Sequence, residues 1–272
     1  MWKGESVDTT GEQTRPEAEQ VAGTQTITRA LAVLGVLRDA EDDVGVTELA
    51  RALGLHTSTT HRILRALASA RYVVQNSQTE RYRLGREALL LGRAASRALG
   101  FDAALPLLEQ LAETTGESVN LSVRDNDDAV VVLRVESAHP LRFIQPVGTR
   151  IPLYCTSTGK ALLAFGGDLH AELAKLGELT RLTPDTLTSP RELLADLEQT
   201  RERGYSVNNG ERIPGVCGVA APVPGEVGLA MGAVAVQGPE VRMPADRIPE
   251  LGELVVQTAT AVTATIPSGY WI

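Results

Sequence analysis

The fold of this chain is decided by residues 44–70, VGVTELARALGLHTSTTHRILRALASA. This stretch contains two short helical patterns joined by a glycine turn. The first pattern has an inward stripe and then Gly54, placed where a left-handed residue ends a helix. The second pattern has apolar or small residues at i, i+3, i+4 and i+7, which define one buried face. The inward residues are Leu49, Ala50 and Leu53 in the first helix, and Thr60, Ile63, Leu64 and Leu67 in the second.

The start of the first helix carries its own signals. Thr47 is expected to cap this helix, with its hydroxyl accepting from an otherwise unpaired backbone N–H. Glu48 then lies at the positive end of the helix dipole, where a carboxylate is favourable.

The exposed side of the second helix is polar and cationic, and no acidic residue occurs from Thr57 to Gln78. A solvated face of an amphipathic helix would also be polar, so this alternative stays open. The absence of carboxylates favours a polyanion as partner, because phosphates repel them. The spacing therefore predicts a helix-turn-helix that reads double-stranded DNA.

The flanking residues extend the motif. Upstream, Ile27, Ala30, Leu31 and Leu34 repeat the helical spacing and predict a helix on which the pair packs. Downstream, residues 72–75 and 81–84 are strand-like runs around the polar turn 76–80. Three helices followed by a hairpin predict a winged helix-turn-helix, whose second motif helix enters the major groove.

The candidate DNA contacts divide by chemistry. We expect one set of side chains to face base edges, where an arginine pairs best with guanine, and another set to hold phosphates. The first set is Ser58, Thr59, His61 and Arg62; the second is Thr57, Arg65, Arg81 and Arg83, and Thr47 is counted as DNA-facing with them.

Charge separates this region from the rest of the chain. Residues 25–100 contain 11 arginines and 7 acidic residues, whereas the whole chain of 272 residues has a net charge of −8. Because salt screens charges over a distance of about 8 to 10 Å, the local balance governs contact with DNA. The basic region is the expected DNA face, and the acidic remainder has another role.

Length and composition indicate two domains in a cytoplasmic protein. With 43% hydrophobic residues, the chain can form two cores. It has no apolar run of about 18 residues and no hydrophobic signal region, so we expect no membrane span and no secretion. Two cysteines suit a reducing compartment. The expected division is an unstructured arm over 1–23, a winged domain over 24–85, a linker helix over 86–100, a second domain over 101–266 and a tail over 267–272.

The linker helix offers a surface for a second chain. Leu89, Leu90, Ala94 and Ala98 are the residues expected to be buried. A helix that packs on its own domain is the alternative. A homodimer is favoured because two-fold related winged domains bind two half-sites.

The second domain mixes helix and strand signals. Helices are predicted over 102–115, from Gly159, and over 190–203; Ala103, Leu107, Leu108 and Leu111 are the inward residues of the first. Strands are predicted over 119–123, 129–135, 218–223 and 229–236, with a closing helix or strand over 255–265. Such hairpin-linked strands with interspersed helices predict an α+β fold on an antiparallel sheet.

The chain resembles the IclR family of bacterial transcriptional regulators, and the resemblance extends from about Thr24 to Thr265. The resemblance rests on three separated motifs in the same order. They are VTELARALGLHTSTTHRILRAL with RYRLG, then VGTRIPLYCTSTGKALLA, and finally ERGYSVNNGERIPGVCGVAAPV with GAVAVQGP.

The resemblance implies an effector-binding second domain, similar to GAF and PAS sensor folds, in a dimer or a dimer of dimers. Its curved sheet would hold a small molecule. Carried over residue by residue, the pocket would be bordered by the loop before one helix and by three strand segments. These residues are Tyr154, Cys155, Ser157, Thr158, Gly159, Asn208, Asn209, Val216, Cys217, Gly218, Ala235 and Gln237.

The residues near Ser157 suit an anion even without the resemblance, because backbone N–H groups at a helix start attract a carboxylate. A plain helix cap is the alternative. In the family, relatives that take small keto-acids have an acidic residue near Asn208, an Arg-Cys pair at Cys217-Gly218 and hydroxyl side chains near Ala235 and Gln237. Tyr154 replaces the histidine that is usual in the family. Fewer charges and hydroxyls favour a larger or less polar ligand, an aromatic or amide-containing acid.

Enzymatic chemistry is not expected. The phosphate-loop motif would need a glycine at 154 and a hydroxyl residue at 161, where the chain has Tyr154 and Ala161. The cysteines and four scattered histidines have no zinc-site spacing, and we expect no metal and no cofactor. The alternative is a GAF-like ligand-binding or hydrolytic module whose winged helix contacts proteins.

Overall fold

The computed structural model describes residues 24–225 and 227–267, and the chain divides into two compact units between Gly92 and Arg93. The predicted arm over 1–23 lies outside the described residues, as does the predicted tail apart from Pro267. Within the described ranges, no helix is both long and apolar enough to cross a membrane.

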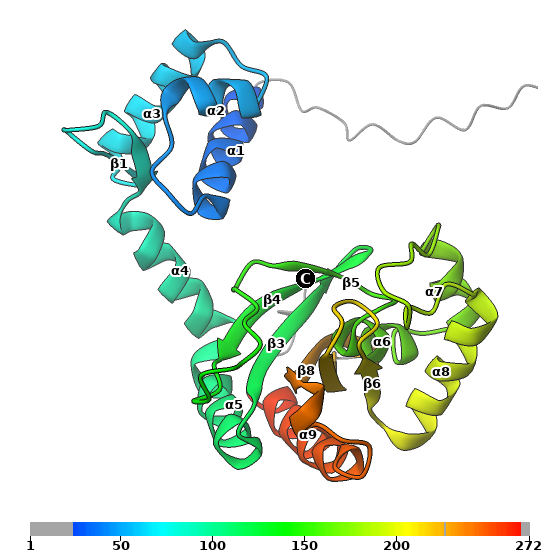
Figure 1. The fold of residues 1–272 in the computed structure, drawn as a ribbon. Coiled ribbons are helices and arrows are strands. Elements are labelled where there is room, and N and C mark those ends of the chain that lie inside the picture. The colour runs from blue at the N-terminus through cyan, green and yellow to red at the C-terminus, as the bar shows by residue number, and fades with distance from the viewer. Residues whose placement is uncertain (1–23, 226, 268–272) are drawn as a thin grey trace, which may run out of the picture. The chain divides into compact units, whose positions relative to one another are not determined.

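The first unit is the predicted winged helix-turn-helix (Figure 1). Its helices are α1 (Gln25–Asp39), α2 (Val46–Ala52) and α3 (Thr57–Ser69). Strands β1 (Val73–Gln75) and β2 (Tyr82–Leu84) pair antiparallel, and we call this hairpin, residues 73–84, the wing. The helix-turn-helix also has its predicted turn, because Gly54 has a left-handed φ of 62°.

The small core of this unit contains the predicted inward residues of α2 and α3, with Leu49 and Leu64 fully buried. The prediction for α1 was partly wrong. Ile27 and Leu31 are 61% and 63% exposed, and the buried residues of α1 are instead Val33 and Leu37. The same helix has a second apolar row, and spacing alone did not tell which row faces α3.

The start of α2 also corrects a prediction. Thr47 is an exposed residue inside the helix and does not cap it. The N-cap is Gly45, whose backbone N–H donates to Glu48 Oε2 at 3.2 Å. Glu48 is therefore at the helix start as predicted, but it receives a hydrogen bond there in addition to the dipole.

Helix α4 (Arg86–Ala98) follows the wing and crosses the boundary between the two units. None of its residues is buried, which corrects the predicted burial of Leu89, Leu90, Ala94 and Ala98. Leu89, Leu90 and Leu91 are each more than half exposed. The apolar pattern is present, but no described part of the same chain covers it.

The second unit is an α+β domain on a six-stranded antiparallel sheet, as predicted. Its sheet order is β5-β4-β3-β8-β7-β6. The strands are β3 (Ser118–Asp125), β4 (Asp128–Val135), β5 (Arg150–Pro152), β6 (Ser206–Asn209), β7 (Val216–Pro224) and β8 (Ala230–Pro239). The helices are α5 (Phe101–Thr115), α6 (Ser157–Ala164), α7 (Leu169–Lys175), α8 (Pro190–Arg203) and α9 (Ile248–Thr263), with a 3₁₀ turn η1 (Glu240–Arg242).

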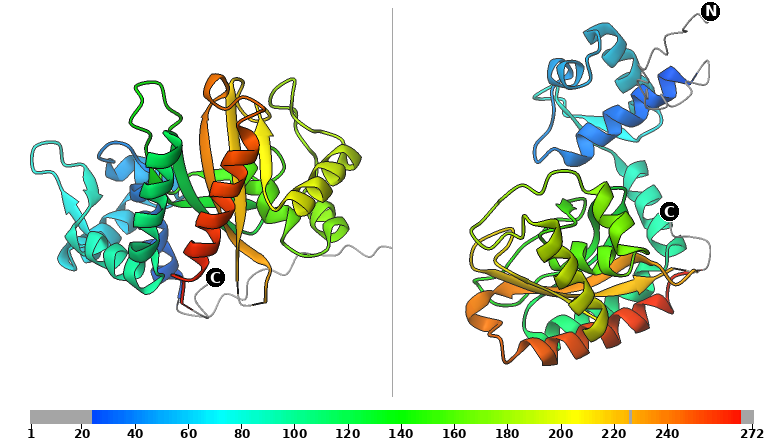
Figure 2. Two further views of the ribbon diagram at one scale, coloured as in Figure 1. Left: turned by 90° about the horizontal axis from the view of Figure 1, so that it is seen from below. Right: turned by 90° about the vertical axis from the view of Figure 1, so that its right-hand side faces the viewer.

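Two cores lie on opposite faces of this sheet. Figures 1 and 2 show α5 and α9 side by side on one face, where Leu121, Val219 and Val236 point. Helices α6 and α8 cover part of the other face, on which Ala220 and Ala235 lie. Side chains alternate along a strand, so the second face also receives Asn120, Asn208, Gly218 and Gln237.

The predicted helices and strands of this unit are present, and the segment over 255–265 lies mainly in helix α9. The short elements β5, β6 and α7 were not predicted. One inward residue was wrong: Ala103 is exposed and Ala104 is buried in its place. The apolar spacing indicates which later residues of this helix are buried, but it does not decide which of two neighbouring alanines near the helix start faces the core.

Candidate functional sites

The first candidate site is the exposed face of α3. Helix α3 begins after its N-cap residue, His56. Its inner side is buried through Thr60, Ile63 and Leu64. The outer side chains Ser58, His61, Arg62 and Arg65 are exposed, as is Thr57, and Thr59 is half-buried. None of these outer side chains has an ion pair with another described residue. The face is therefore a free set of hydroxyl, imidazole and guanidinium groups.

The wing arginines differ from each other. The guanidinium of Arg81 makes two contacts to Glu48, at 3.1 and 2.7 Å, and its Nε donates to the Asp43 carbonyl at 2.7 Å. Arg83 is 65% exposed and lies 3.9 Å from Asp43. Arg81 thus fastens the wing to the start of α2, which leaves Arg83 as the available wing cation. Two hydrogen bonds lower the pKa of Glu48. The larger effect comes from the backbone N–H of Gly45, and the next largest comes from the Arg81 guanidinium.

The second candidate site is a pocket on the α6 side of the six-stranded sheet. Its empty volume, including the open mouth, is about 310 Å³. Residues from α6, from three strands and from two loops line it. They are Phe143, Gln145, Thr156, Ser157, Asn208, Arg212, Ile213, Val216, Cys217, Gly218 and Gln237.

Amide side chains form one wall of the pocket. Asn120 Nδ2 donates to Gln145 Oε1 at 3.2 Å and to Gln237 Oε1 at 3.1 Å. Ser122 Oγ donates to Asn120 Oδ1 at 3.3 Å, so the wall is tied to β3. The wall is polar but uncharged.

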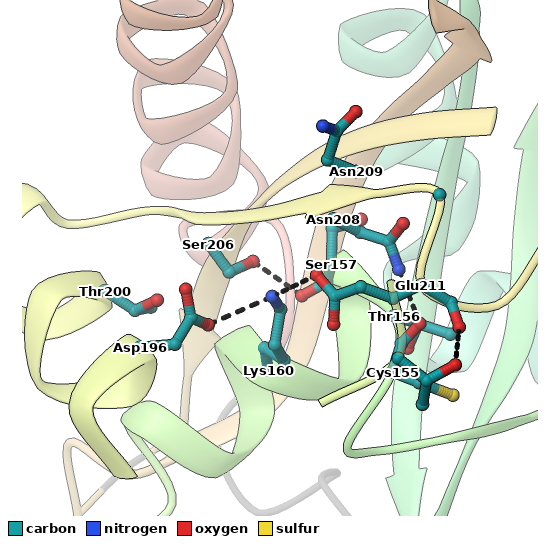
Figure 3. A network of polar contacts seen from close by, with 12 residues as sticks. Cys155, Thr156, Ser157, Lys160, Asp196, Thr200, Ser206, Asn208, Asn209 and Glu211 are labelled. Atoms are coloured by element: carbon teal, nitrogen blue, oxygen red, sulfur yellow. Dashed lines mark hydrogen bonds and ion pairs between the residues drawn. The ribbon is translucent and has the colours of Figure 1, made fainter. Parts of the chain in front are cut away.

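The start of α6 forms another wall. Thr156 is its N-cap, and its hydroxyl accepts from the Gly159 N–H at 3.0 Å. Ser157 Oγ is buried and has no hydrogen-bond partner among the described residues. Asn208 is held beside them by donating to the Cys155 carbonyl. Figure 3 shows these side chains gathered at the helix start, with Asn209 turned away from them.

A buried ion-pair cluster lies behind this wall. Lys160, 1% exposed, contacts Glu211 at 2.6 Å and Asp196 at 3.0 Å (Figure 3). Burial raises the pKa of Glu211, and the neighbouring Lys160 charge opposes that shift. Lys160 therefore links α6, α8 and the loop between β6 and β7.

Half of the predicted effector residues line this pocket and half do not. Those that line it are Ser157, Asn208, Val216, Cys217, Gly218 and Gln237. Those outside its lining are Tyr154, Cys155, Thr158, Gly159, Asn209 and Ala235.

Several residues outside the lining have structural contacts instead. Tyr154 donates its hydroxyl to the Thr180 carbonyl, and Asn209 accepts from the Cys217 thiol. A Cβ on Gly159 would lie 2.2 Å from the Leu153 carbonyl oxygen, so this glycine permits close packing. Burial raises the pKa of the Cys155 thiol to about 11, which keeps it protonated and unreactive at neutral pH.

Four lining residues were missed from the sequence: Phe143, Gln145, Arg212 and Ile213. Thr156 also lines the pocket, and it belongs to the loop 154–159 that the resemblance placed there. Phe143 and Gln145 belong to the irregular segment between β4 and β5, which has no periodic pattern. Arg212 and Ile213 fall inside the motif ERGYSVNNGERIPGV, which contributed to the family resemblance. The positive charge of Arg212 in this motif was the signal that could have placed these residues at the pocket.

Two family models match this chain. The model for the IclR helix-turn-helix domain matches residues 26–77, and the model for the C-terminal domain of bacterial transcriptional regulator IclR matches residues 94–264. The chain belongs to the IclR family of bacterial transcriptional regulators. The two matches cover the α3 face and the pocket respectively.

Individual relatives agree with this placement. This IclR-family chain is 36% identical to the HTH-type transcriptional regulator BhcR of Paracoccus denitrificans, over 89% of this chain and 87% of that protein. It is 34% identical to the transcriptional repressor IclR of Escherichia coli, over 92% of each. A crystal structure of a transcriptional regulator from Rhodococcus sp. RHA1 superposes with a TM-score of 0.78 at 32% identity, over 89% of this chain and 98% of that one.

These similarities identify the general role of the protein. It is a DNA-binding transcriptional regulator, and the relatives that match it are regulators rather than enzymes. They give no support to a hydrolytic module with a winged helix for protein contacts.

Proposed function

We propose that this regulator binds its operator through α3 and that a small molecule in the pocket of the second unit controls operator affinity. The observation that carries the proposal is the free polar face of α3, which combines two arginines with hydroxyl groups and no paired acid. Reading of the major groove requires groups of this kind, hydrogen-bond donors on one exposed helix face.

Within that face, Arg62 with Ser58, Thr59 and His61 contacts base edges, while Thr57 and Arg65 hold phosphates. Arg83 on the wing adds a phosphate contact. Arg81 contributes by fixing the wing, because its guanidinium is already bound to Glu48 and Asp43. Thr47, exposed in the first turn of α2, is a further phosphate contact.

The effector is a small organic acid, in keeping with a pocket that contains hydroxyl, amide and cationic groups. Its binding changes operator affinity by its differential affinity for two arrangements of the winged domains, typically about 1 to 3 kcal/mol. Whether the bound protein blocks or recruits polymerase depends on the operator position.

The protein acts as a homodimer or a dimer of dimers. Leu89, Leu90 and Leu91 on α4 expose an apolar surface that a second α4 would cover. Two winged domains then reach two half-sites, which a single winged domain cannot do.

The experiment that tests this function is an operator-binding titration with the full chain. DNA from beside the protein's own gene is used at several salt concentrations. Specific binding that weakens as salt rises supports the proposal, because phosphate contacts release counterions. Binding that is absent at low salt, or that does not depend on sequence, contradicts it.

A further inference from the structure

We propose that residues 138–147, which we call the strap, open and close over the pocket, and that the hydrogen bond from Asn120 to Gln145 holds the strap closed. The strap controls how a ligand enters the pocket, so this role rests on the proposed function.

The strap connects β4 to β5 without regular structure. None of residues 138–145 has a backbone-to-backbone hydrogen bond with another described residue. Both ends are fastened, because Ser137 Oγ donates to the Gly116 carbonyl at 2.6 Å and the Gly148 N–H donates to the Val131 carbonyl at 2.8 Å. Gly148 has a left-handed φ of 91°, and a Cβ there would meet no atom within 4 Å, which suits a hinge. A segment held mainly at its ends opens locally at a low cost in free energy.

One side chain fastens the middle of the strap to the sheet. Gln145 is the only buried residue of the strap, and its Oε1 accepts from Asn120 Nδ2 on β3 at 3.2 Å. Among the described residues, no other hydrogen bond joins residues 139–147 to a strand. Arg142 pairs at 2.9 Å with Glu136, which precedes the strap, but the two side chains are 32% and 34% exposed, so this pair is a weak restraint. The Asn120–Gln145 bond is therefore the latch of the strap.

Empty space lies on both sides of the latch. A second cavity lies between the strap and strands β3 and β4, with an empty volume of about 220 Å³ including its mouth. Phe143, Gln145 and Gln237 line both this cavity and the pocket. The strap is thus not close-packed on the sheet as protein interiors are, and it has room to move.

The other loop at the pocket, between β6 and β7, is fixed. Its Gly210 and Glu211 carbonyls accept from Thr183 Oγ1 at 2.8 and 3.2 Å. The Glu211 side chain is bound to the buried Lys160 at 2.6 Å. Because this loop is fastened in its middle by several contacts and the strap by one, the strap is the part that moves.

Opening of the strap breaks the latch and moves Phe143 away from the pocket. The sheet stays intact, since Asn120 keeps Gln237 as a partner at 3.1 Å and still accepts from Ser122. Closure over a bound ligand returns Phe143 to the pocket and excludes water from it, as lids do in other proteins.

Two rates test the strap on the full-length protein. Trypsin cleavage after Arg142, inside the strap, measures opening, because cleavage requires a locally opened segment. The reaction of N-ethylmaleimide with a Ser157→Cys variant measures access to the pocket wall. Fragment masses separate this thiol from Cys155, which lies in the same tryptic peptide.

Both rates are compared between Gln145→Ala and Gln237→Ala, each combined with Ser157→Cys. Gln237→Ala is the matched control, because it also truncates an amide that lines the pocket and bonds to Asn120, but on β8 instead of the strap. Cleavage after Arg212, in the fixed loop, is followed in the same samples to detect any general loosening of the fold.

The expected result is that Gln145→Ala raises cleavage after Arg142 and maleimide labelling by the same factor. This factor should be about 2- to 10-fold, the effect of losing one neutral hydrogen bond. Gln237→Ala should change neither rate, and cleavage after Arg212 should be the same in both variants.

Unchanged cleavage after Arg142 in Gln145→Ala overturns the inference, as does an equal rise in Gln237→Ala or an equal rise after Arg212. Faster cleavage with unchanged labelling shows that the strap does not control the pocket, and it also overturns the inference. The proposed function is tested separately by operator binding of the same proteins without ligand. Loss of operator binding by the wild type would contradict that function and would leave the strap rates as they are.

Discussion

Lys160 Nζ lies 2.6 Å from Glu211 Oε1, and this buried ion pair joins helix α6 to the loop between β6 and β7. The two residues are 51 positions apart in the chain. They lie behind the pocket. Because Ser157 is on the same helix as Lys160 and Arg212 follows Glu211, this one contact joins the two segments that carry these pocket residues. The pair is completed by Asp196 on α8, 3.0 Å from the same ammonium group.

Replacing Lys160 with Met should destabilise the second unit by about 3 to 5 kcal/mol, because two carboxylates lose their cation in a buried site. Glu211→Gln should cost less, since Lys160 keeps Asp196 as a partner. Chemical denaturation of the full chain measures both. Lys175→Met is the control, because this lysine is 56% exposed where it pairs with Glu172.

The loss in Lys160→Met should also depend on pH. Burial already raises the pKa of Glu211, and Lys160 opposes that shift, so removing the lysine raises the folded-state pKa further. The folded protein then binds more protons than the unfolded chain above the ordinary value of 4.5, and stability falls as pH rises through this window. A loss that is constant with pH would contradict this explanation.

Arg62→Ala should weaken operator binding by about 1 to 3 kcal/mol and relax the base preference at one position. Arg65→Ala should weaken binding equally for all sequences and reduce the salt slope by about 1, because it removes a phosphate contact. Anisotropy titrations with operator variants separate the two effects. An Arg62→Ala protein with unchanged sequence preference would remove Arg62 from the base-reading set.

The sequence predicted the winged helix-turn-helix and the α+β domain because both depend on local apolar spacing, as with Ile63, Leu64 and Leu67 on α3. Half of the pocket was predicted, through motif residues such as Ser157 and Gly218. The rest depends on contacts between distant segments. Phe143 and Gln145 reach the pocket from an irregular segment, and nothing in the sequence showed that Arg81 pairs with Glu48.

Arg81 and Glu48 should act together in stabilising the winged domain. The pKa of Glu48 is lowered by the Gly45 N–H and by Arg81, so its contribution is complete above its ordinary pKa of 4.5 and is lost as pH falls below the lowered folded-state value. Arg81→Ala and Glu48→Gln should each reduce this acid sensitivity, and the double variant should resemble either single one. Additive losses would show that the two side chains act independently. Arg83→Ala is the control and should affect DNA affinity without changing stability.

Leu90→Glu on α4 should weaken self-association, because a charge would replace an apolar contact at the proposed surface between two chains. The mass in solution, measured by light scattering over a concentration series, should shift towards the monomer, and operator affinity should fall with it. Val241→Glu is the matched control, since Val241 is also exposed, at 77%, but lies in η1. An oligomer as stable as the wild type would place the interface elsewhere.

The most direct test of ligand-controlled DNA binding is an anisotropy titration of the full-length protein with DNA from beside its own gene. It is carried out over a salt series, with and without each small molecule that stabilises the protein. We expect log affinity to fall linearly with log salt, and at least one ligand to change operator affinity by about 5- to 150-fold. Affinity that is the same with and without every stabilising ligand would contradict the account.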